Sequence, residues 1–204
     1  NLNMNYLGGD LNAYKIINFY KKDELQRVFH LYGEINQAEK LAKYIVNERS
    51  KKKINTNYEL IEILRDSGVN FRSKKIHFAT QAFQALRIES NNELENLIIF
   101  LEKVHNFLKI NGYLAIISFH SLEDRIVKNY FRDNKVTKNK KFQNNKDWGF
   151  ENLTKKPLVA SKFEIIKNKR SRSAKLRVGR FINWLIIFLN SLCYLSLLFY
   201  FWVL

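Results

Sequence analysis

The sequence predicts an α/β fold in which a helical subdomain accompanies a unit of alternating helix and strand. Residues 11–67 carry helical periodicity without a strand signal, whereas residues 92–130 show the pattern of helix, strand and helix. Such alternation is typical of domains built around a largely parallel sheet. We therefore expect a helical insert over residues 1–72, an α/β domain over residues 73–180 and an apolar tail over residues 181–204.

Three helices are expected in the first of these segments. Apolar side chains recur at helical spacing over residues 23–33, and Gly33 is a typical helix terminator. A second apolar stripe covers residues 38–46, and Thr56 is expected to cap a third helix. The intervening basic residues over 49–53 are equally compatible with a solvated helix face and with a phosphate contact.

A buried strand is expected at residues 112–119, after a long helix over residues 92–109. The strand sequence, GYLAIISF, is an uninterrupted apolar run behind an Asn-Gly turn, which favours a strand covered on both faces. A helix follows, because apolar side chains then recur at helical spacing. Ser121 is the expected N-cap of that helix, and Asp124 three positions later would complete a capping box.

The chain beyond this helix contains a polar loop and a second strand. Residues 133–148 are rich in lysine and asparagine and lack periodicity, which predicts a flexible loop. Residues 173–178 alternate between polar and apolar side chains, as expected for a short strand.

The tail, residues 181–204, contains no charged side chain. As a helix it would be about 36 Å long, enough to cross a hydrocarbon core of about 30 Å. Basic residues just before it would keep the body of the protein in the cytoplasm and the tail in the inner membrane. A buried terminal helix is the alternative. The basic residues are Arg172, Lys175, Arg177 and Arg180.

The charge of the chain points to a polyanionic partner. A formal net charge of +16 favours nucleic acid or an anionic membrane surface. The same sequence is also rich in Asn, Ile, Phe and Tyr, and a compositional bias of this kind weakens the inference. The single cysteine, Cys193, excludes an intrachain disulfide and a paired-cysteine metal site, so we expect a cytosolic, metal-free body.

Polar side chains gather where the strand at residues 112–119 ends, and open α/β sheets bind ligands at this edge. His120 lies at the junction of strand and helix, where a ring nitrogen can face a ligand. A histidine bonded to a nearby backbone carbonyl is the commoner outcome. For Glu123, Asp124 and Arg125, the solvated first turn of a helix is an interpretation of equal weight.

Four segments resemble the signature blocks of a known enzyme family. They are KIHFATQAFQALRI, NGYLAIISFHSLEDRIVK, TKKP and NKRSRSAKLRV, and they are similar to blocks of the bacterial small-subunit rRNA cytosine methyltransferase H family, also called RsmH or MraW. The helical stretch ELQRVFHLYGEINQAEKLAKYIVNER is similar to the family as well. The likeness covers residues 1–178. Phe78 and Gln81 depart from it, because the family usually has proline and arginine there.

The resemblance implies a class I (Rossmann-like) methyltransferase domain with an inserted helical subdomain that recognises cytidine. It implies methyl transfer from S-adenosylmethionine to the exocyclic amine of a cytidine in the decoding region of 16S rRNA, with the small ribosomal subunit as partner and no metal. The family's glycine-rich DGTxGxGGHS-type cofactor loop has no counterpart in the sequence, so no cofactor-binding residue is assigned. The chain is accordingly expected to be the carboxyl-terminal part of such an enzyme, and a second chain is a candidate supplier of the missing strands.

On this resemblance, His120, Ser121 and Glu123 would line the methyl-transfer pocket and contact the base or the methionine end of the cofactor. Six basic residues are candidates for substrate binding. Arg87 and Arg125 would contact either phosphates or acidic residues. The other four would position the RNA through its backbone, and they are Lys155, Lys156, Arg170 and Arg172. Two alternative functions remain compatible with the sequence. The chain could be a noncatalytic basic RNA-binding remnant or a membrane-tethered fusion product.

Overall fold

The chain forms two compact units, Asn1–Leu94 and Glu95–Leu204, each with its own hydrophobic core. We call them the helical unit and the α/β unit. The computed structural model describes residues 2–6, 8–70, 79–133 and 148–183. The mixed helix and sheet content agrees with the α/β class expected from the sequence.

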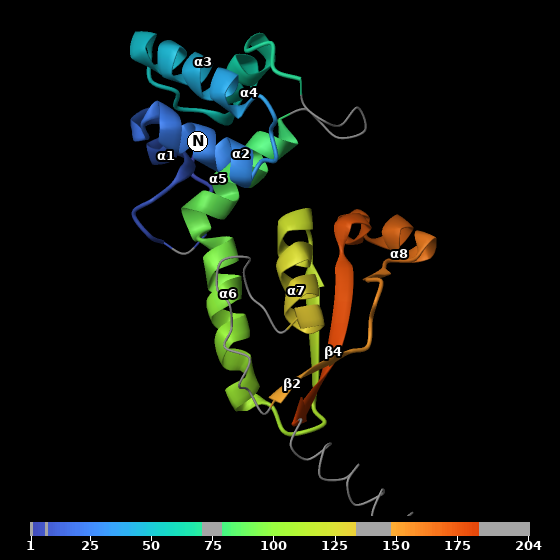
Figure 1. The fold of residues 1–204 in the computed structure, drawn as a ribbon. Helices are drawn as coiled ribbons and strands as arrows, with labels where there is room; N and C mark the ends of the chain where they lie inside the picture. Colours follow the sequence, from blue (N-terminus) through green and yellow to red (C-terminus); the bar gives the residue numbers. More distant parts are fainter. Residues whose placement is uncertain (1, 7, 71–78, 134–147, 184–204) are drawn as a thin grey trace, which may run out of the picture. The chain divides into compact units, whose positions relative to one another are not determined.

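The helical unit contains five helices within the described residues (Figure 1). The three predicted from apolar stripes are confirmed as α2, α3 and α4, and α1 and α5 are additional. Their bounds are Ala13–Phe19 for α1, Lys22–Leu31 for α2, Ala38–Lys51 for α3, Asn57–Asp66 for α4 and Thr80–Asn91 for α5.

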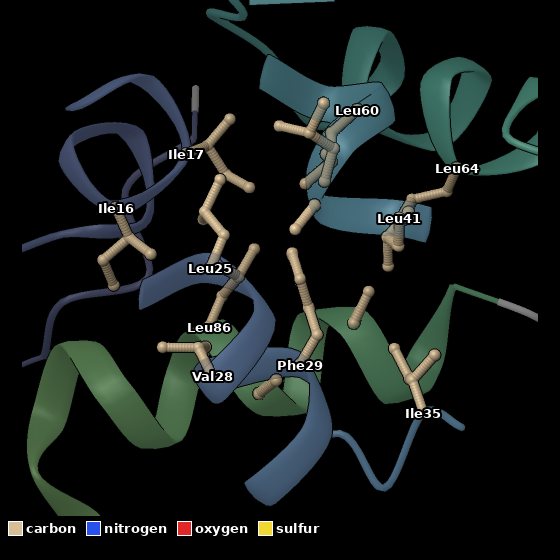
Figure 2. Close-up of a cluster of buried hydrophobic side chains, with 14 of the residues drawn as sticks. Ile16, Ile17, Leu25, Val28, Phe29, Ile35, Leu41, Leu60, Leu64 and Leu86 are labelled. Carbon is tan, nitrogen blue, oxygen red and sulfur yellow. The ribbon is translucent and has the colours of Figure 1, made fainter. Parts of the chain in front are cut away.

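The core of the helical unit is formed by the apolar stripes of all five helices (Figure 2). Leu25 and Phe29 of α2 are fully buried, and α2 contacts both α3 and α5. Each such side chain contributes roughly 1.5–3 kcal/mol when it leaves water. The labelled members of the core are Ile16, Ile17, Leu25, Val28, Phe29, Ile35, Leu41, Leu60, Leu64 and Leu86.

Helix α4 begins with the predicted cap. The Thr56 hydroxyl accepts the backbone N–H of Glu59 at 3.2 Å, and the Glu59 carboxylate accepts the backbone N–H of Thr56 at 3.0 Å. This reciprocal pair satisfies two donors that the first turn of a helix leaves free.

The basic residues in the last turn of α3 and just after it are bound within the helical unit. Arg49 donates to two backbone carbonyls at the end of α1. Lys51 and Lys52 form ion pairs with glutamates at 2.7 and 2.8 Å. The Lys53 Nζ lies 4.7 Å from the centroid of the Phe19 ring. These contacts favour a structural role over a phosphate contact.

A buried carboxylate joins α5 to α2 and to Tyr20, the residue that follows α1. The Glu89 Oε1 atom of α5 accepts the Tyr20 hydroxyl at 3.0 Å and lies 2.6 Å from Nη2 of Arg27 in α2. Burial and the nearby Glu89 charge together raise the pKa of Tyr20 to about 12.

Replacing Tyr20 with phenylalanine is expected to flatten the alkaline stability profile. The tyrosine has a pKa near 10 in an unfolded chain and about 12 when folded. Its contribution is therefore complete below pH 10 and is lost as the pH rises through 12. Urea unfolding from pH 9 to 12 checks this: the free energy of unfolding should fall less steeply for Tyr20→Phe than for the unsubstituted chain, and equal slopes would contradict it.

The α/β unit is built around strand β4 (Figure 1). This strand pairs with β1 along one edge and with β2 and β3 along the other, and every pairing is antiparallel. The strands are β1 (Tyr113–Ser118), β2 (Trp148–Asn152), β3 (Leu158–Val159) and β4 (Lys175–Asn183). The helices are α6 (Glu93–Lys103), α7 (Ser121–Asp133) and α8 (Lys162–Lys167), with 3₁₀ turns η1 (Val104–Phe107) and η2 (Lys169–Ser173).

The strands predicted at residues 112–119 and 173–178 are confirmed as β1 and β4, but the expected covering of both faces is wrong for β1. Leu114 and Ser118 are buried, whereas Tyr113 and Ile117 of the opposite face are 64% and 57% exposed. A purely apolar run does not reveal which alternate side chains reach a core. Within the described residues, the antiparallel partner β4 and the helix α7 leave one face of β1 open.

The core of the α/β unit is a cluster of aromatic rings between α7 and the sheet. Tyr130 and Phe131 of α7 meet Phe150 of β2 at ring-centroid distances of 5.3 and 5.5 Å. Phe181 of β4 lies 5.4 Å from Phe150, and Trp148 lies 5.7 Å from Phe181. The cluster fixes the helix that follows β1 against β2 and β4.

The loop and the tail expected from the sequence fall largely outside the described residues. Residues 134–147 and 184–204 belong to this part of the chain. Trp148 already belongs to β2, and residues 181–183 continue β4 instead of beginning an apolar helix. Among the described helices, none combines the length and apolar character needed to cross a bilayer.

Candidate functional site at the end of strand β1

The three predicted catalytic residues lie together where β1 passes into α7. His120 sits between the end of the strand and the first residue of the helix, Ser121, and Glu123 is in the first helical turn. His120 is 9% exposed, Ser121 is exposed and the Glu123 side chain is 23% exposed. The turn therefore presents one buried ring beside a partly accessible carboxylate.

His120 and Glu123 hold each other in a fixed arrangement. The backbone N–H of Glu123 donates to the His120 Nδ1 atom at 3.4 Å, which turns Nε2 toward the Glu123 carboxylate. That Nε2 atom lies 3.3 Å from Glu123 Oε1. The second carboxylate oxygen, Oε2, accepts the backbone N–H of Phe119 at 2.8 Å.

These contacts form the amino-terminal cap of α7, and the predicted capping box of Ser121 and Asp124 is wrong by one residue. His120 supplies the side-chain acceptor, and Glu123 reaches back to the backbone of the strand end. The sequence rule favours serine, threonine, aspartate and asparagine at caps, so it passes over a histidine whose ring nitrogen accepts the same bond.

Glu123 is held in its charged form. Burial by itself would raise the pKa of its carboxyl, but the hydrogen bonds from His120 and from the Phe119 backbone outweigh burial, and the pKa is lowered from its ordinary value. The strand end therefore carries an oriented carboxylate next to the His120 ring.

Asp124 is not part of a solvated turn but of a buried ion pair that sequence analysis missed. Its Oδ1 atom lies 2.7 Å from Nε of Arg177 in β4, and its Oδ2 atom is 3.3 Å from Arg177 Nη2 and 3.4 Å from Lys175 Nζ. The Arg177 side chain is only 4% exposed. Burial opposes ionisation of Asp124, yet Arg177 and Lys175 lower its pKa. The pair fixes the first turn of α7 to β4 beneath the candidate site.

The predicted RNA-contacting residues occupy different places. Arg87 belongs to the helical unit, where its guanidinium forms a two-pronged pair with Glu93 at 2.8 and 3.0 Å. Arg125 is exposed on α7. The remaining four are exposed on the segment around β3, α8 and η2. These are Lys155, Lys156, Arg170 and Arg172.

Strand register places this last segment at the same end of the sheet as His120. Lys175, the first residue of β4, pairs with Ser118 at the end of β1 and with Val159 of β3. The Ser118 hydroxyl also donates to the Lys175 carbonyl at 3.4 Å. The segment that carries the four basic residues therefore reaches the end of the sheet at which β1 passes into α7, with β4 between this segment and β1.

The glycines near the amino end do not fit a nucleotide cradle. Gly8 has a positive φ of 71°, but no strand precedes it in the described residues. The next helix, α1, begins four residues after Gly9 behind its own cap, Asn12. A phosphate-type or dinucleotide-type loop requires a strand before the glycines and a helix directly after them. The described part of the chain offers no such strand, loop and helix for a cofactor.

Comparison with known proteins places these residues in a family. Residues 4–182 match the model of the MraW methylase family. A ribosomal RNA small subunit methyltransferase H from Sulfurihydrogenibium sp. is 51% identical over 171 residues, which are 83% of this chain and 55% of the relative. The corresponding proteins of Brachyspira hyodysenteriae and Campylobacter jejuni are 44% and 46% identical over 83% and 85% of the chain.

The chain thus spans a little over half the length of these curated relatives, at 55–57% of each. The matched region extends over most of both compact units and includes the whole turn from β1 to α7. With a family model covering residues 4–182, the chain belongs to the MraW methylase family.

Proposed function

We propose that this chain forms the carboxyl-terminal part of a class I methyltransferase domain together with its inserted cytidine-recognising helical subdomain. The activity is S-adenosylmethionine-dependent methylation of the exocyclic amine of a cytidine in 16S rRNA. The names of the relatives support this assignment. The proposal places the chain in the cytoplasm with the small ribosomal subunit as its partner.

The paired side chains of His120 and Glu123 at the end of β1 carry the proposal. An exocyclic amine of cytosine is a weak nucleophile, because its lone pair is delocalised into the ring, so an enzyme must orient it and accept its proton. The Glu123 carboxylate has a lowered pKa, accepts the Phe119 backbone N–H at 2.8 Å, lies 3.3 Å from His120 Nε2 and is partly accessible. In the proposed site, the Glu123 carboxylate orients the amine and receives its proton, the His120 ring holds that carboxylate in place, and Ser121 contacts the base from the same turn.

S-adenosylmethionine supplies the methyl group when it is bound. The described residues provide no glycine cradle for it, so the cofactor contacts are assigned to the part of the relatives that this chain does not match. In the proposed enzyme that part also pairs with the open edge of β1, either within one polypeptide or as a second chain. An uncovered strand edge favours such pairing.

Substitutions at His120 separate a catalytic role from a capping role. In a complete enzyme, made by fusing the chain to the unmatched segment of the Sulfurihydrogenibium relative, His120→Asn keeps a side-chain cap acceptor but removes the imidazole. We expect kcat to fall by roughly 10²-fold or more, while the free energy of unfolding stays within about 1 kcal/mol. His120→Ala should lose both turnover and about 0.5–2 kcal/mol. Unchanged turnover in His120→Asn removes His120 from the site.

A noncatalytic RNA-binding protein is the second candidate, and the lack of a described glycine cradle favours it. Titration of the unfused chain with S-adenosylmethionine by calorimetry separates the two. Micromolar binding would contradict the noncatalytic candidate. Absence of binding by the unfused chain would not contradict the methyltransferase proposal, which is tested by turnover of the fused enzyme.

A further inference from the structure

Residues 153–172 expose large apolar side chains beside the candidate site. Leu158 and Val159 of β3 are 57% and 67% exposed, and Phe163 and Ile166 of α8 are 67% and 78% exposed. We call the exposed side of this segment the 153–172 surface. Figure 1 shows α8 standing away from the sheet, next to the beginning of β4. With Leu153, which is 46% exposed, five exposed apolar side chains lie on this short segment and point to a binding role.

Polar contacts, not these apolar side chains, fix the segment to the sheet. The Thr154 hydroxyl accepts the backbone N–H of Val178 at 2.9 Å, and β3 pairs with the start of β4. Ser161 caps α8 by accepting the Glu164 N–H at 3.2 Å. Ser171, which is 6% exposed, donates to the Asn168 carbonyl at 2.8 Å. The exposed apolar side chains are therefore available to a partner without loss of the local fold.

The excess of basic side chains on the surface favours a negatively charged partner. Residues 153–172 contain seven lysines and arginines and a single acidic residue, Glu164. Among the described residues, Lys155, Lys156, Arg170 and Arg172 form no ion pair, in contrast to the paired Lys51 and Lys52 of the helical unit. Lys167 Nζ lies 4.7 Å from the Phe163 ring centroid, which places a cation beside an exposed aromatic face.

We propose that the 153–172 surface binds unpaired nucleotides of an RNA strand, with a base stacked on Phe163 and phosphates held by the surrounding basic side chains. The identification of RNA rests on the proposed function. Single-stranded RNA suits this surface because unpaired bases stack on exposed aromatic rings, whereas a duplex hides its base faces. The register of β1, β3 and β4 brings the bound strand to the end of the sheet that holds His120.

An anionic membrane is the other partner that basic and apolar side chains accommodate. A membrane-surface helix needs an apolar face long enough to enter the headgroup layer. Helix α8 has six residues, and its two exposed apolar side chains, Phe163 and Ile166, are interleaved with lysines of the same turns. The combination of a single aromatic ring and many separated cations fits a nucleic acid strand better than a lipid surface.

The test compares two equally exposed apolar residues on α8. Binding of a fluorescein-labelled 12-nucleotide single-stranded RNA and of the matching duplex is measured by anisotropy with the full chain. Phe163→Ser should weaken single-strand binding by roughly 5- to 150-fold, the range for loss of one stacked base. Ile166→Ser is the matched control and should change the affinity by less than about twofold, because isoleucine has no stacking face. Arg170→Gln should reduce the salt slope by about 0.7.

Two results would overturn the inference. One is an equal loss, or no loss, of single-strand affinity in Phe163→Ser and Ile166→Ser, provided that tryptophan emission shows both variants folded. The other concerns a membrane partner, tested by co-sedimentation of the same proteins with anionic phospholipid vesicles. If both variants bind RNA as tightly as the unsubstituted chain but no longer bind the vesicles, the surface binds lipid and not RNA. These experiments measure RNA binding and not methyl transfer. Phe163-dependent RNA binding would therefore support the inference even if the fused enzyme proved inactive.

Discussion

Replacing Arg177 with methionine is expected to lower the free energy of unfolding of the α/β unit by about 3–5 kcal/mol. The substitution removes the principal partner of Asp124, whose side chain is 12% exposed, and leaves its charge in a largely water-free site. Lys175 remains 3.4 Å from Asp124, which favours the lower end of the range. The loss should also loosen the first turn of α7, where His120 and Glu123 lie.

Arg180→Met is the matched control on the same strand. Arg180 pairs with Glu151, but their side chains are 40% and 46% exposed, so the loss should be about 0–1 kcal/mol. Urea unfolding followed by tryptophan fluorescence reports on this unit, because all three tryptophans lie within Glu95–Leu204. Equal costs at Arg177 and Arg180 would contradict a structural role for the buried pair. The double substitution Asp124→Leu with Arg177→Met should recover most of the loss.

Gly179→Ala is expected to destabilise the same unit by roughly 1–3 kcal/mol. A Cβ atom at position 179 would lie 2.5 Å from Cε1 and 2.6 Å from Cδ1 of Phe131, and 3.2 Å from Cδ1 of Phe150. The Phe131 ring is 1% exposed and packed among other rings, so it has little room to move. The strand needs glycine here because an aromatic ring occupies the space of the side chain.

A double-variant cycle tests this explanation. Phe131→Leu removes the ring that would collide with the new Cβ, so Gly179→Ala should cost clearly less in the Phe131→Leu background than in the unsubstituted chain. The same urea titration measures all four proteins. Strictly additive costs would show that the collision with Phe131 is not the cause.

Much of the local structure could be predicted from the sequence. The apolar stripes gave α2, α3 and α4 in the right places, and Thr56 caps α4 as expected. The apolar run behind the Asn-Gly turn located β1. These features depend on residues a few positions apart, so the spacing of apolar side chains along the sequence is enough to predict them.

Features that depend on distant residues were missed. Strand β2, Trp148–Asn152, has Gly149 as its second residue and ends in Glu and Asn, so its strand character comes from pairing with β4. The Asp124 and Arg177 pair joins positions 53 residues apart, and no local pattern indicates it. The one-sided burial of β1 likewise follows from its antiparallel partner and not from its own composition.

At the candidate site, sequence analysis located the turn but not its internal bonding. The position of His120 and Glu123 after a buried strand follows from the change of periodicity at Ser121. His120 caps α7 because its ring is turned so that Nδ1 accepts the Glu123 backbone N–H. No local sequence pattern indicates this orientation. The family resemblance stated from four motifs is confirmed by the match over residues 4–182.

The central claim is that the β1 to α7 turn of this chain completes a methyl-transfer site. The most direct measurement is incorporation of tritiated methyl groups from S-adenosylmethionine into small ribosomal subunits by the fusion with the Sulfurihydrogenibium segment, followed by mapping of the modified nucleotide. We expect one cytidine of 16S rRNA methylated on its exocyclic amine. No incorporation by a folded fusion, under conditions in which the complete relative is active, would contradict the claim.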